Sequence, residues 1–181
     1  MQYNQQKARR RYQNSVNNAQ GHFFEGYIKV ACAIYRDDKR AEIEKTPEPF
    51  RVMKKHQDGT FTGRFTAHAQ PDFQGTLNGG RSICFEAKCT TTDRMKRSVL
   101  TDTQMEALEY HSQLGAVAGV CIGIQNKFFF IPWEAWQDMK KIYGRQYVTA
   151  EDVEQYRVKF TGAVMFLDYV HDGAKFALKL T

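Results

Sequence analysis

The stretch that decides the fold is Gln70-Pro71-Asp72-Phe73-Gln74-Gly75, followed after a glycine-marked turn by Ser82-Ile83-Cys84-Phe85-Glu86-Ala87-Lys88. Side chains alternate between the two faces of a β-strand, so Glu86 and Lys88 project from one face while Phe85 and Ala87 project from the other. Charged residues are seldom buried without a partner or a metal ion, yet this pair interrupts a segment rich in strand-forming residues. One face of the predicted strand therefore carries an anion and a cation that need an explanation.

A tight turn connects these two segments. Asn78-Gly79-Gly80 supplies residues that tolerate the positive φ angles of hairpin turns. If residues 73–77 pair antiparallel with residues 81–88, the register can bring the carboxylate of Asp72 near that of Glu86. Two carboxylates beside an ammonium group suit Mg²⁺, which binds a few protein oxygens and keeps several waters for a phosphate substrate. The pattern predicts a metal site at the end of this hairpin.

The same residues also have a simpler interpretation. A Glu-x-Lys pair on a strand is a common short motif, so residues 86 and 88 could lie on the surface, with Asp72 as an unrelated turn residue. The turn and the apolar residues around the charged pair favour the metal site. Both interpretations stay open on this evidence.

Motifs on both sides extend the pattern, and together they resemble a known group of nucleases. The Asp…Glu-x-Lys arrangement resembles the PD-(D/E)xK nuclease signature, and Pro71-Asp72 matches its first two letters. More narrowly, the run from Phe73 to Thr90 is similar to the RecU family of Holliday-junction resolvases. Further matches in the same order are Gly21-His22-Phe23-Phe24-Glu25, Thr46-Pro47-Glu48-Pro49 and Thr101-Asp102-Thr103-Gln104.

The resemblance implies an α/β fold, in which a restriction-endonuclease-like mixed β-sheet is flanked by helices. It also implies a homodimer and a protruding stalk, which the family is thought to insert into the junction. Residues 56–70, with Asp58-Gly59 as a turn signal, are expected to form a shorter counterpart of this stalk. The short stalk and divergent tail would suit a phage-encoded member.

Two further site residues are implied by the resemblance. The family places an acidic residue of its first helix beside the metal, which would be Glu25, and a glutamine facing the active site, which would be Gln104. By pattern alone, Glu25 is a solvent-side glutamate of a helix. Thr101 and Gln104 form a capping box at the start of a helix. We do not expect one glutamine side chain to serve both the cap and the site.

Length, composition and charge fit one compact domain that binds a polyanion. The chain has 181 residues, and 26 Lys and Arg against 20 Asp and Glu give it a formal net charge of +6. A basic balance favours a partner such as DNA. No segment approaches the ~20 consecutive apolar residues of a membrane span, and the polar N-terminus lacks the apolar core of a signal peptide. We expect a cytoplasmic protein with no membrane partner.

Cysteines and histidines give no sign of a zinc site. The four cysteines form no Cys-x-x-Cys pair, and the five histidines form no His-x-x-x-His pair. Buried, reduced thiols are the expected state of the cysteines. We expect no small-molecule organic cofactor.

Basic and aromatic residues predict several DNA contacts. Residues 1–20 are expected to be a flexible basic arm, and residues 21–181 a single nuclease domain that includes the stalk. Aromatic residues of the stalk could stack on unpaired bases. The alternatives are a solvated tail and an ordinary loop whose phenylalanines fold onto the core. The residues predicted to contact DNA are Arg9, Arg10, Arg11, Phe61, Arg64, Phe65, Arg81, Arg94, Lys96 and Arg97.

Apolar periodicity predicts the remaining elements. They are a helix over 15–36, a turn entering a strand over 46–52, helices over 102–114 and 132–143, strands over 116–124 and 127–131, a short helix starting at 149–152, and edge elements at 158–160 and 163–167. Trp133 and Trp136 lie on one helix face and are expected in the core or in a subunit contact.

The predicted function is that of a Mg²⁺-dependent endonuclease, with Mn²⁺ as a substitute, that resolves four-way junctions by paired symmetric nicks in recombination and repair. Asp72, Glu86 and the backbone carbonyl of Ala87 would bind the metal. Lysine acts as a base at neutral pH only when its pKa is lowered, so Lys88 is expected to position the attacking water and stabilise charge. The alternatives are a nuclease of the same fold acting on flaps or duplex DNA, and a non-catalytic junction-binding protein.

Overall fold

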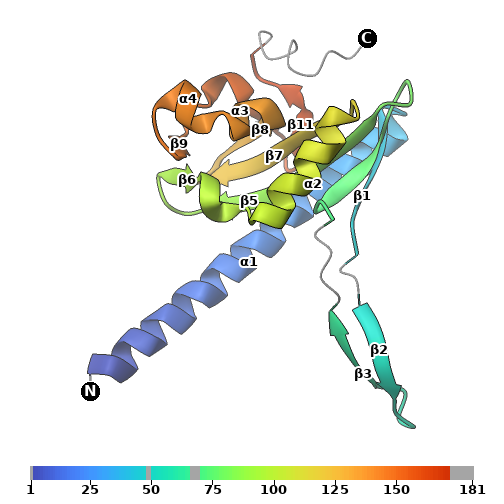
Figure 1. The fold of residues 1–181 in the computed structure, drawn as a ribbon, viewed down its shortest axis with the longest axis vertical. Coiled ribbons are helices and arrows are strands. Elements are labelled where there is room, and N and C mark those ends of the chain that lie inside the picture. The colour runs from blue at the N-terminus through green and yellow to red at the C-terminus, as the bar shows by residue number, and fades with distance from the viewer. Residues whose placement is uncertain (1, 48–49, 66–69, 172–181) are drawn as a thin grey trace.

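A five-stranded mixed sheet forms the centre of the molecule (Figure 1). The structure is a computed structural model that describes residues 2–47, 50–65 and 70–171. Along the sheet the strands are β1 (Ala41–Lys45), β4 (Phe73–Leu77), β5 (Ser82–Thr90), β7 (Val117–Ile124) and β8 (Lys127–Pro132). β5 and β7 are parallel, and the other neighbours are antiparallel. The predicted α/β fold, a mixed sheet flanked by helices, is confirmed.

The hairpin of β4 and β5 has the register that places the charged residues together. Phe73 pairs with Phe85 and Thr76 with Ser82. The turn between the strands uses Gly79 and Gly80 at φ angles of 91° and 87°, where other residues would be strained. Asp72 comes one residue before β4, so continuing the register places it beside Glu86.

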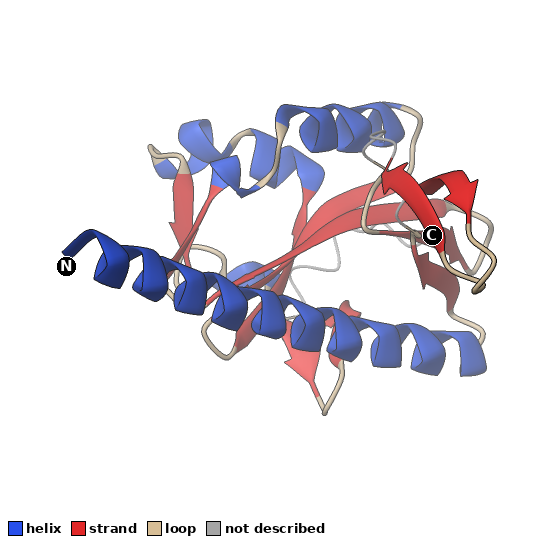
Figure 2. Cartoon of the chain, turned by 90° about the horizontal axis from the view of Figure 1, so that it is seen from below, coloured by secondary structure: helices blue, strands red, loops and turns tan. Residues whose placement is uncertain are grey.

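Helices cover both faces of the sheet (Figure 2). On one face, α1 (Gln2–Asp37) contacts β1 and β5, together with the separate hairpin of β10 (Val158–Phe160) and β11 (Val164–Tyr169). On the other face, α2 (Asp102–Gln113) contacts β5 and β7, and α3 (Trp133–Gln137) and α4 (Met139–Tyr143) follow. Each face of the sheet therefore has its own apolar core. Alternate side chains of the buried strands project into one core or the other.

Aromatic rings fill the core under α1. The Phe73 and Phe85 rings stack across the hairpin with their centroids 5.1 Å apart, and Phe85 also contacts Phe130 and Phe166. The core under α2 holds Trp133 and Trp136, both buried, as the sequence predicts. The four cysteines carry free thiols, and three of them are buried.

The first helix is longer than its predicted range. It begins at Gln2 instead of near residue 15, so the expected flexible arm is helical, and Figure 1 shows this part running past the edge of the sheet. Residues 2–20 contain no glycine or proline and are rich in Gln and Arg, which favour helix once the packed part has nucleated it.

The stalk is a separate two-stranded hairpin that projects from the sheet (Figure 1). It consists of β2 (Phe50–Lys55) and β3 (Phe61–Phe65), so it begins before residue 56, where we predicted its start. The strand predicted over 46–52 therefore belongs to the stalk. The core strand that sequence analysis missed is β1, whose alternation of buried Ala41 and Ile43 with exposed Glu42 and Glu44 was the available signal.

The C-terminal third also differs from prediction. The helix predicted over 132–143 is split at Asp138 into α3 and α4. β9 (Tyr147–Thr149), which pairs with β6 (Arg94–Lys96), ends where a short helix was expected to start, and a turn follows it. Asp152 accepts hydrogen bonds from Thr149, so the capping residues form a turn. Short 3₁₀ turns occur at Arg97–Val99 and Glu154–Tyr156.

A buried tyrosine ties the first helix to the last strand. The Tyr35 hydroxyl donates to Asp168 and accepts from the Leu167 N–H, both at 3.0 Å. Arg40 donates two hydrogen bonds to the same aspartate, at 3.0 and 2.8 Å. This contact joins residues more than a hundred positions apart and fixes α1 on its face of the sheet.

Replacing Tyr35 with phenylalanine should lower the free energy of unfolding by about 1–3 kcal/mol, because the Leu167 N–H would lose its buried acceptor. Urea denaturation followed by circular dichroism measures the change. Tyr110→Phe, at an exposed position of α2, is the matched control and should leave stability unchanged. Equal stability of the two variants would contradict the assigned role of Tyr35.

Candidate active site

The end of β5 brings Asp72, Glu86 and Lys88 into direct contact. The Lys88 ammonium donates to Asp72 Oδ2 and to Glu86 Oε2, in both cases at 2.9 Å. The Ala87 N–H donates to Asp72 Oδ2 at 3.0 Å. The hairpin register thus produces the arrangement that the sequence predicts, in which an ammonium group joins two carboxylates.

Glu86 is the most unusual member of this group. Its side chain has no exposed surface (0%), and its Oε1 is buried without a hydrogen-bond partner among the described residues. Burial, together with the neighbouring Asp72 carboxylate, raises the pKa of Glu86 to about 7, against the attraction of Lys88. A buried carboxylate oxygen without a partner is costly. A bound cation would satisfy it, so the donor set fits a hard divalent metal ion.

The pKa values of Asp72 and Lys88 are both shifted toward the charged forms. Burial would raise the pKa of Asp72, but the Lys88 ammonium and the Ala87 N–H outweigh it, and the pKa lies below its usual value. Burial would likewise lower the pKa of Lys88, but the carboxylates of Glu86 and Asp72 outweigh it, and the pKa is raised. Lys88 is therefore held as a cation, which suits charge stabilisation better than proton abstraction.

Gln104 serves both roles that we expected to exclude each other. Its Oε1 accepts from the Thr101 N–H at 3.0 Å, which completes the capping box of α2. Its Nε2 donates to Glu86 Oε2 at 2.5 Å. The expectation was wrong because the two ends of a side-chain amide are independent, one an acceptor and the other a donor.

Glu25 of α1 contacts the end of β1, and its place in a water network beside the metal stays a prediction. It forms an ion pair with Lys45, the last residue of β1. The described contacts therefore join Glu25 to β1 rather than directly to Asp72 or Glu86. Sequence analysis missed Lys45, since only the pairing of β1 with β4 brings it next to the start of β4.

The available oxygen ligands are few. Within the described ranges, no group of three or more His, Cys, Asp or Glu residues could hold a metal ion. The backbone supplies a further candidate, because the N–H and C=O of one residue project from the same edge of a strand. The Ala87 N–H points to Asp72, so its carbonyl lies on the same open edge of β5, beyond the start of β4.

Comparison with known proteins decides the family. The model of the family RecU, recombination protein U, matches residues 19–172. This chain belongs to the RecU family of Holliday-junction resolvases. A search of solved structures found Hjc, a Holliday junction resolvase from Archaeoglobus fulgidus, with 12% identity, a TM-score of 0.45, and coverage of 72% of this chain and 88% of that one. No curated protein matched.

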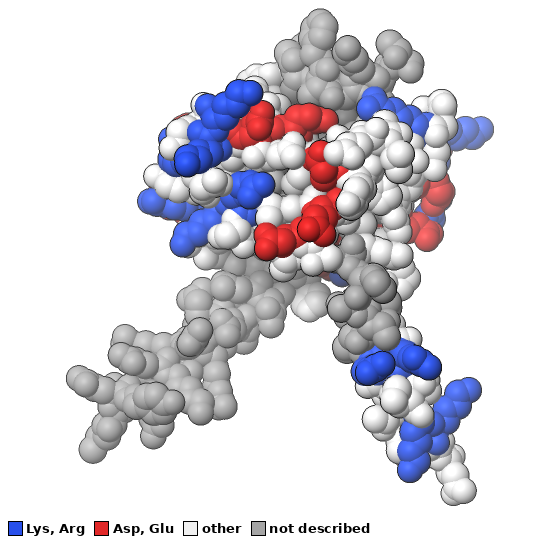
Figure 3. Space-filling model, in the orientation of Figure 1, with Lys and Arg blue, Asp and Glu red and all other residues white. Residues whose placement is uncertain are grey.

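In this RecU-family chain, the predicted DNA contacts fall into two groups on the surface (Figure 3). One group lies on the stalk, where Phe61 and Arg64 are exposed. Sequence analysis missed three other basic residues there, which are Arg51, Lys54 and Lys55. The second group lies on β6, where Lys96 is exposed and Arg94 pairs with Asp93 and stacks on Tyr147.

The other predicted DNA contacts are bonded within the protein, partly buried, or outside the described part of the structure. Arg81 donates to the Gly115 carbonyl at 2.9 Å, and Arg97 is partly buried beside β6. The side chains of Arg9, Arg10, Arg11 and Phe65 lie outside the described part of the structure. None of the helices in the described part is both long and apolar enough to cross a membrane.

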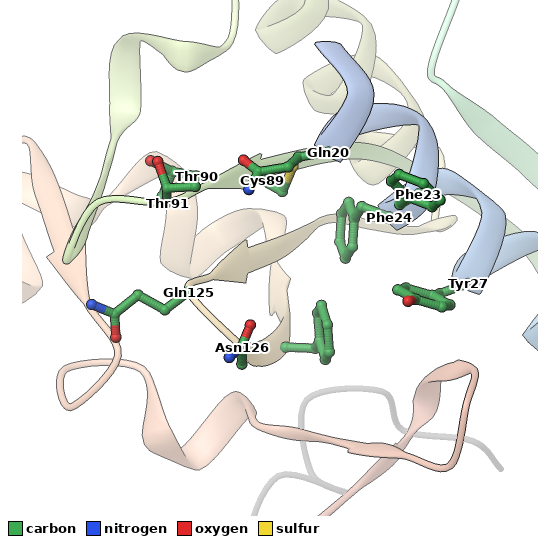
Figure 4. A pocket seen from close by; sticks show the side chains of 10 residues that line it. Gln20, Phe23, Phe24, Tyr27, Cys89, Thr90, Thr91, Gln125 and Asn126 are labelled. Carbon is green, nitrogen blue, oxygen red and sulfur yellow. The ribbon is translucent and has the colours of Figure 1, made fainter. Parts of the chain in front are cut away.

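A hollow of about 340 Å³ lies between α1 and the far end of β5 (Figure 4). Phe23, Phe24 and Tyr27 of α1 line one side, and Gln125 and Asn126 of the β7–β8 turn line another. It also includes Cys89, which packs against the core under α1. Cys89 comes one residue after Lys88 on β5, so its side chain projects from the opposite face of the sheet to those of Glu86 and Lys88. The hollow therefore opens on the opposite face from the carboxylates.

Replacing Gln104 with alanine should lower the free energy of unfolding by about 1–3 kcal/mol, because both the helix cap and a hydrogen bond to buried Glu86 are lost. Thermal or urea denaturation measures the loss. Gln113→Ala removes an exposed hydrogen bond to Glu109 at the other end of α2 and is the control. A Gln104 variant as stable as the control would contradict the double role.

Proposed function

We propose that this protein is a Mg²⁺-dependent endonuclease that acts as a homodimer and resolves four-way DNA junctions by paired symmetric nicks in recombination and repair. The observation that carries the proposal is buried Glu86, with one oxygen lacking a partner, held beside Asp72 and Lys88 in a chain of the RecU family. A fold gives no activity by itself, so this site carries the argument.

Asp72, Glu86 and the Ala87 carbonyl would hold the metal ion. Mg²⁺ is the proposed ion, with Mn²⁺ as a substitute, because the candidate ligands are all oxygens and leave room for several waters. When bound, the ion supplies Lewis-acid polarisation of the scissile phosphate and makes water a stronger nucleophile. Unpartnered Glu86 Oε1 is the atom that gains most from the ion, since burial keeps solvent from it.

The other residues of the site position the reacting groups. Lys88 stays charged, so it would orient the attacking water and stabilise negative charge that develops on the phosphate. Gln104 holds Glu86 Oε2 and leaves Oε1 to the metal. Glu25, paired with Lys45, would act from α1 on the water network of the site.

The stalk and the basic surfaces would hold the junction. Exposed Phe61 would stack on an unpaired base, and exposed Arg64 with its basic neighbours on β2 would contact phosphates. The remaining proposed DNA contacts are Arg9, Arg10, Arg11, Phe65, Arg81, Arg94, Lys96 and Arg97. Two symmetric nicks need two active sites, which a two-fold dimer would provide on one substrate.

Glu86→Gln should reduce nicking of a labelled four-way junction by at least about 10²-fold, because the amide is a weak ligand in place of a carboxylate. Junction binding in Ca²⁺, measured by gel shift, should stay within about threefold of the wild type. Glu151→Gln, on an exposed turn, should behave as the wild type. EDTA should abolish nicking, and Mg²⁺ or Mn²⁺ should restore it.

The same assay separates the proposal from its alternatives. Equal cleavage of a junction and of a linear duplex with matching sequence would indicate a nuclease of the same fold acting on flaps or duplex DNA. Binding without cleavage in either metal would indicate a junction-binding protein. Full activity of the Glu86 variant would contradict the assigned metal site.

A further inference from the structure

Thr46 lies where the chain leaves the central sheet for the stalk. It follows Lys45, the last residue of β1, and the chain returns to the sheet at Pro71 and Asp72, just before β4. Strands β2 and β3 of the stalk lie between these two points. Thr46 and Asp72, the proposed metal ligand, therefore lie at the two ends of the chain segment that forms the stalk.

Two hydrogen bonds from Thr46 join the two ends of this segment at the base of the stalk. The Thr46 N–H donates to the Asp72 carbonyl at 2.9 Å, and the Thr46 Oγ1 hydroxyl donates to the Pro71 carbonyl at 2.6 Å. The paired residues of β1 and β4 end at Lys45 and Phe73, so these bonds extend the contact beyond the last pair. Pro71 is buried and Thr46 is partly buried, so water competes poorly for these two hydrogen bonds.

Asp72 is thus held from two sides. Its carboxylate receives hydrogen bonds from the Ala87 N–H and from Lys88 on β5, and its backbone is held by Thr46 beyond the end of β1. Asp72 lies outside the paired part of β4, where the strand itself gives no further support. The position of its carboxylate therefore depends on Thr46 as well as on β5.

We infer that Thr46 is a positioning residue that sets the Asp72 carboxylate for metal binding and joins the base of the stalk to the active site. This inference rests on the proposed function. When the stalk binds a junction, any force on the stalk acts on the segment that carries Asp72, the proposed metal ligand. Junction binding and the position of the Asp72 carboxylate would therefore both depend on the two hydrogen bonds of Thr46. The Oγ1 hydroxyl of Thr46 is the atom that makes this link, because the N–H bond needs no particular side chain.

The test compares Thr46→Val, which removes the hydroxyl and keeps the branched shape, with Thr46→Ser, which keeps the hydroxyl. Calorimetric titration with Mn²⁺ should show affinity roughly fivefold to tenfold weaker for the valine variant and close to wild type for the serine variant. On junctions, the valine variant should lose kcat by a similar factor with KM unchanged, and its preference for junction over duplex should fall. Thr76→Val, at the exposed far end of β4, is the control.

The outcomes separate this inference from the proposed function. Wild-type metal affinity in Thr46→Val, or equal losses in the valine and serine variants, would overturn the role of the hydroxyl whether or not the protein cleaves junctions. A wild-type protein that binds Mn²⁺ but nicks no junction would count against the proposed function alone. If Thr46→Val does not fold, Thr46→Ala takes its place beside Thr46→Ser, and the same difference in Mn²⁺ affinity between the two variants is expected.

Discussion

The burial of the Glu86 carboxylate is the constraint on which the rest of the site depends. A fully buried anion is tolerated only when charges and donors surround it, and here Lys88 and Gln104 both contact its Oε2. They leave Oε1 without a partner. This carboxylate oxygen, left without a partner among the described residues, is the basis of the proposed metal site.

The fold supplies each of these contacts from a different element. The β4–β5 hairpin places Asp72 beside Glu86, the capped start of α2 delivers Gln104, and the end of β1 holds the backbone of Asp72. The stalk is inserted between β1 and β4, at the point where Asp72 is held. The stalk proposed to bind DNA and the proposed metal ligand Asp72 are therefore adjacent along the chain.

Local patterns predicted much of this arrangement. The turn at Gly79-Gly80, the alternation along β5 and the capping box at Thr101 depend on residues close in sequence, and the structure has all three. The full helix α1 and the core strand β1 were not predicted, because helix propagation and strand pairing depend on packing that short patterns do not show. The ion pair of Glu25 with Lys45 and the bonds of Thr46 to Pro71 and Asp72 join distant residues. Nothing in the local sequence indicates them.

The central claim is that Asp72 and Glu86 share one divalent cation. The most direct measurement is a crystal structure of the protein soaked in Mn²⁺, with the ion located by its anomalous scattering. We predict a peak about 2.0–2.4 Å from a carboxylate oxygen of Asp72 and from Oε1 of Glu86. An anomalous map without a peak between these two side chains, with manganese bound elsewhere in the molecule, would contradict it.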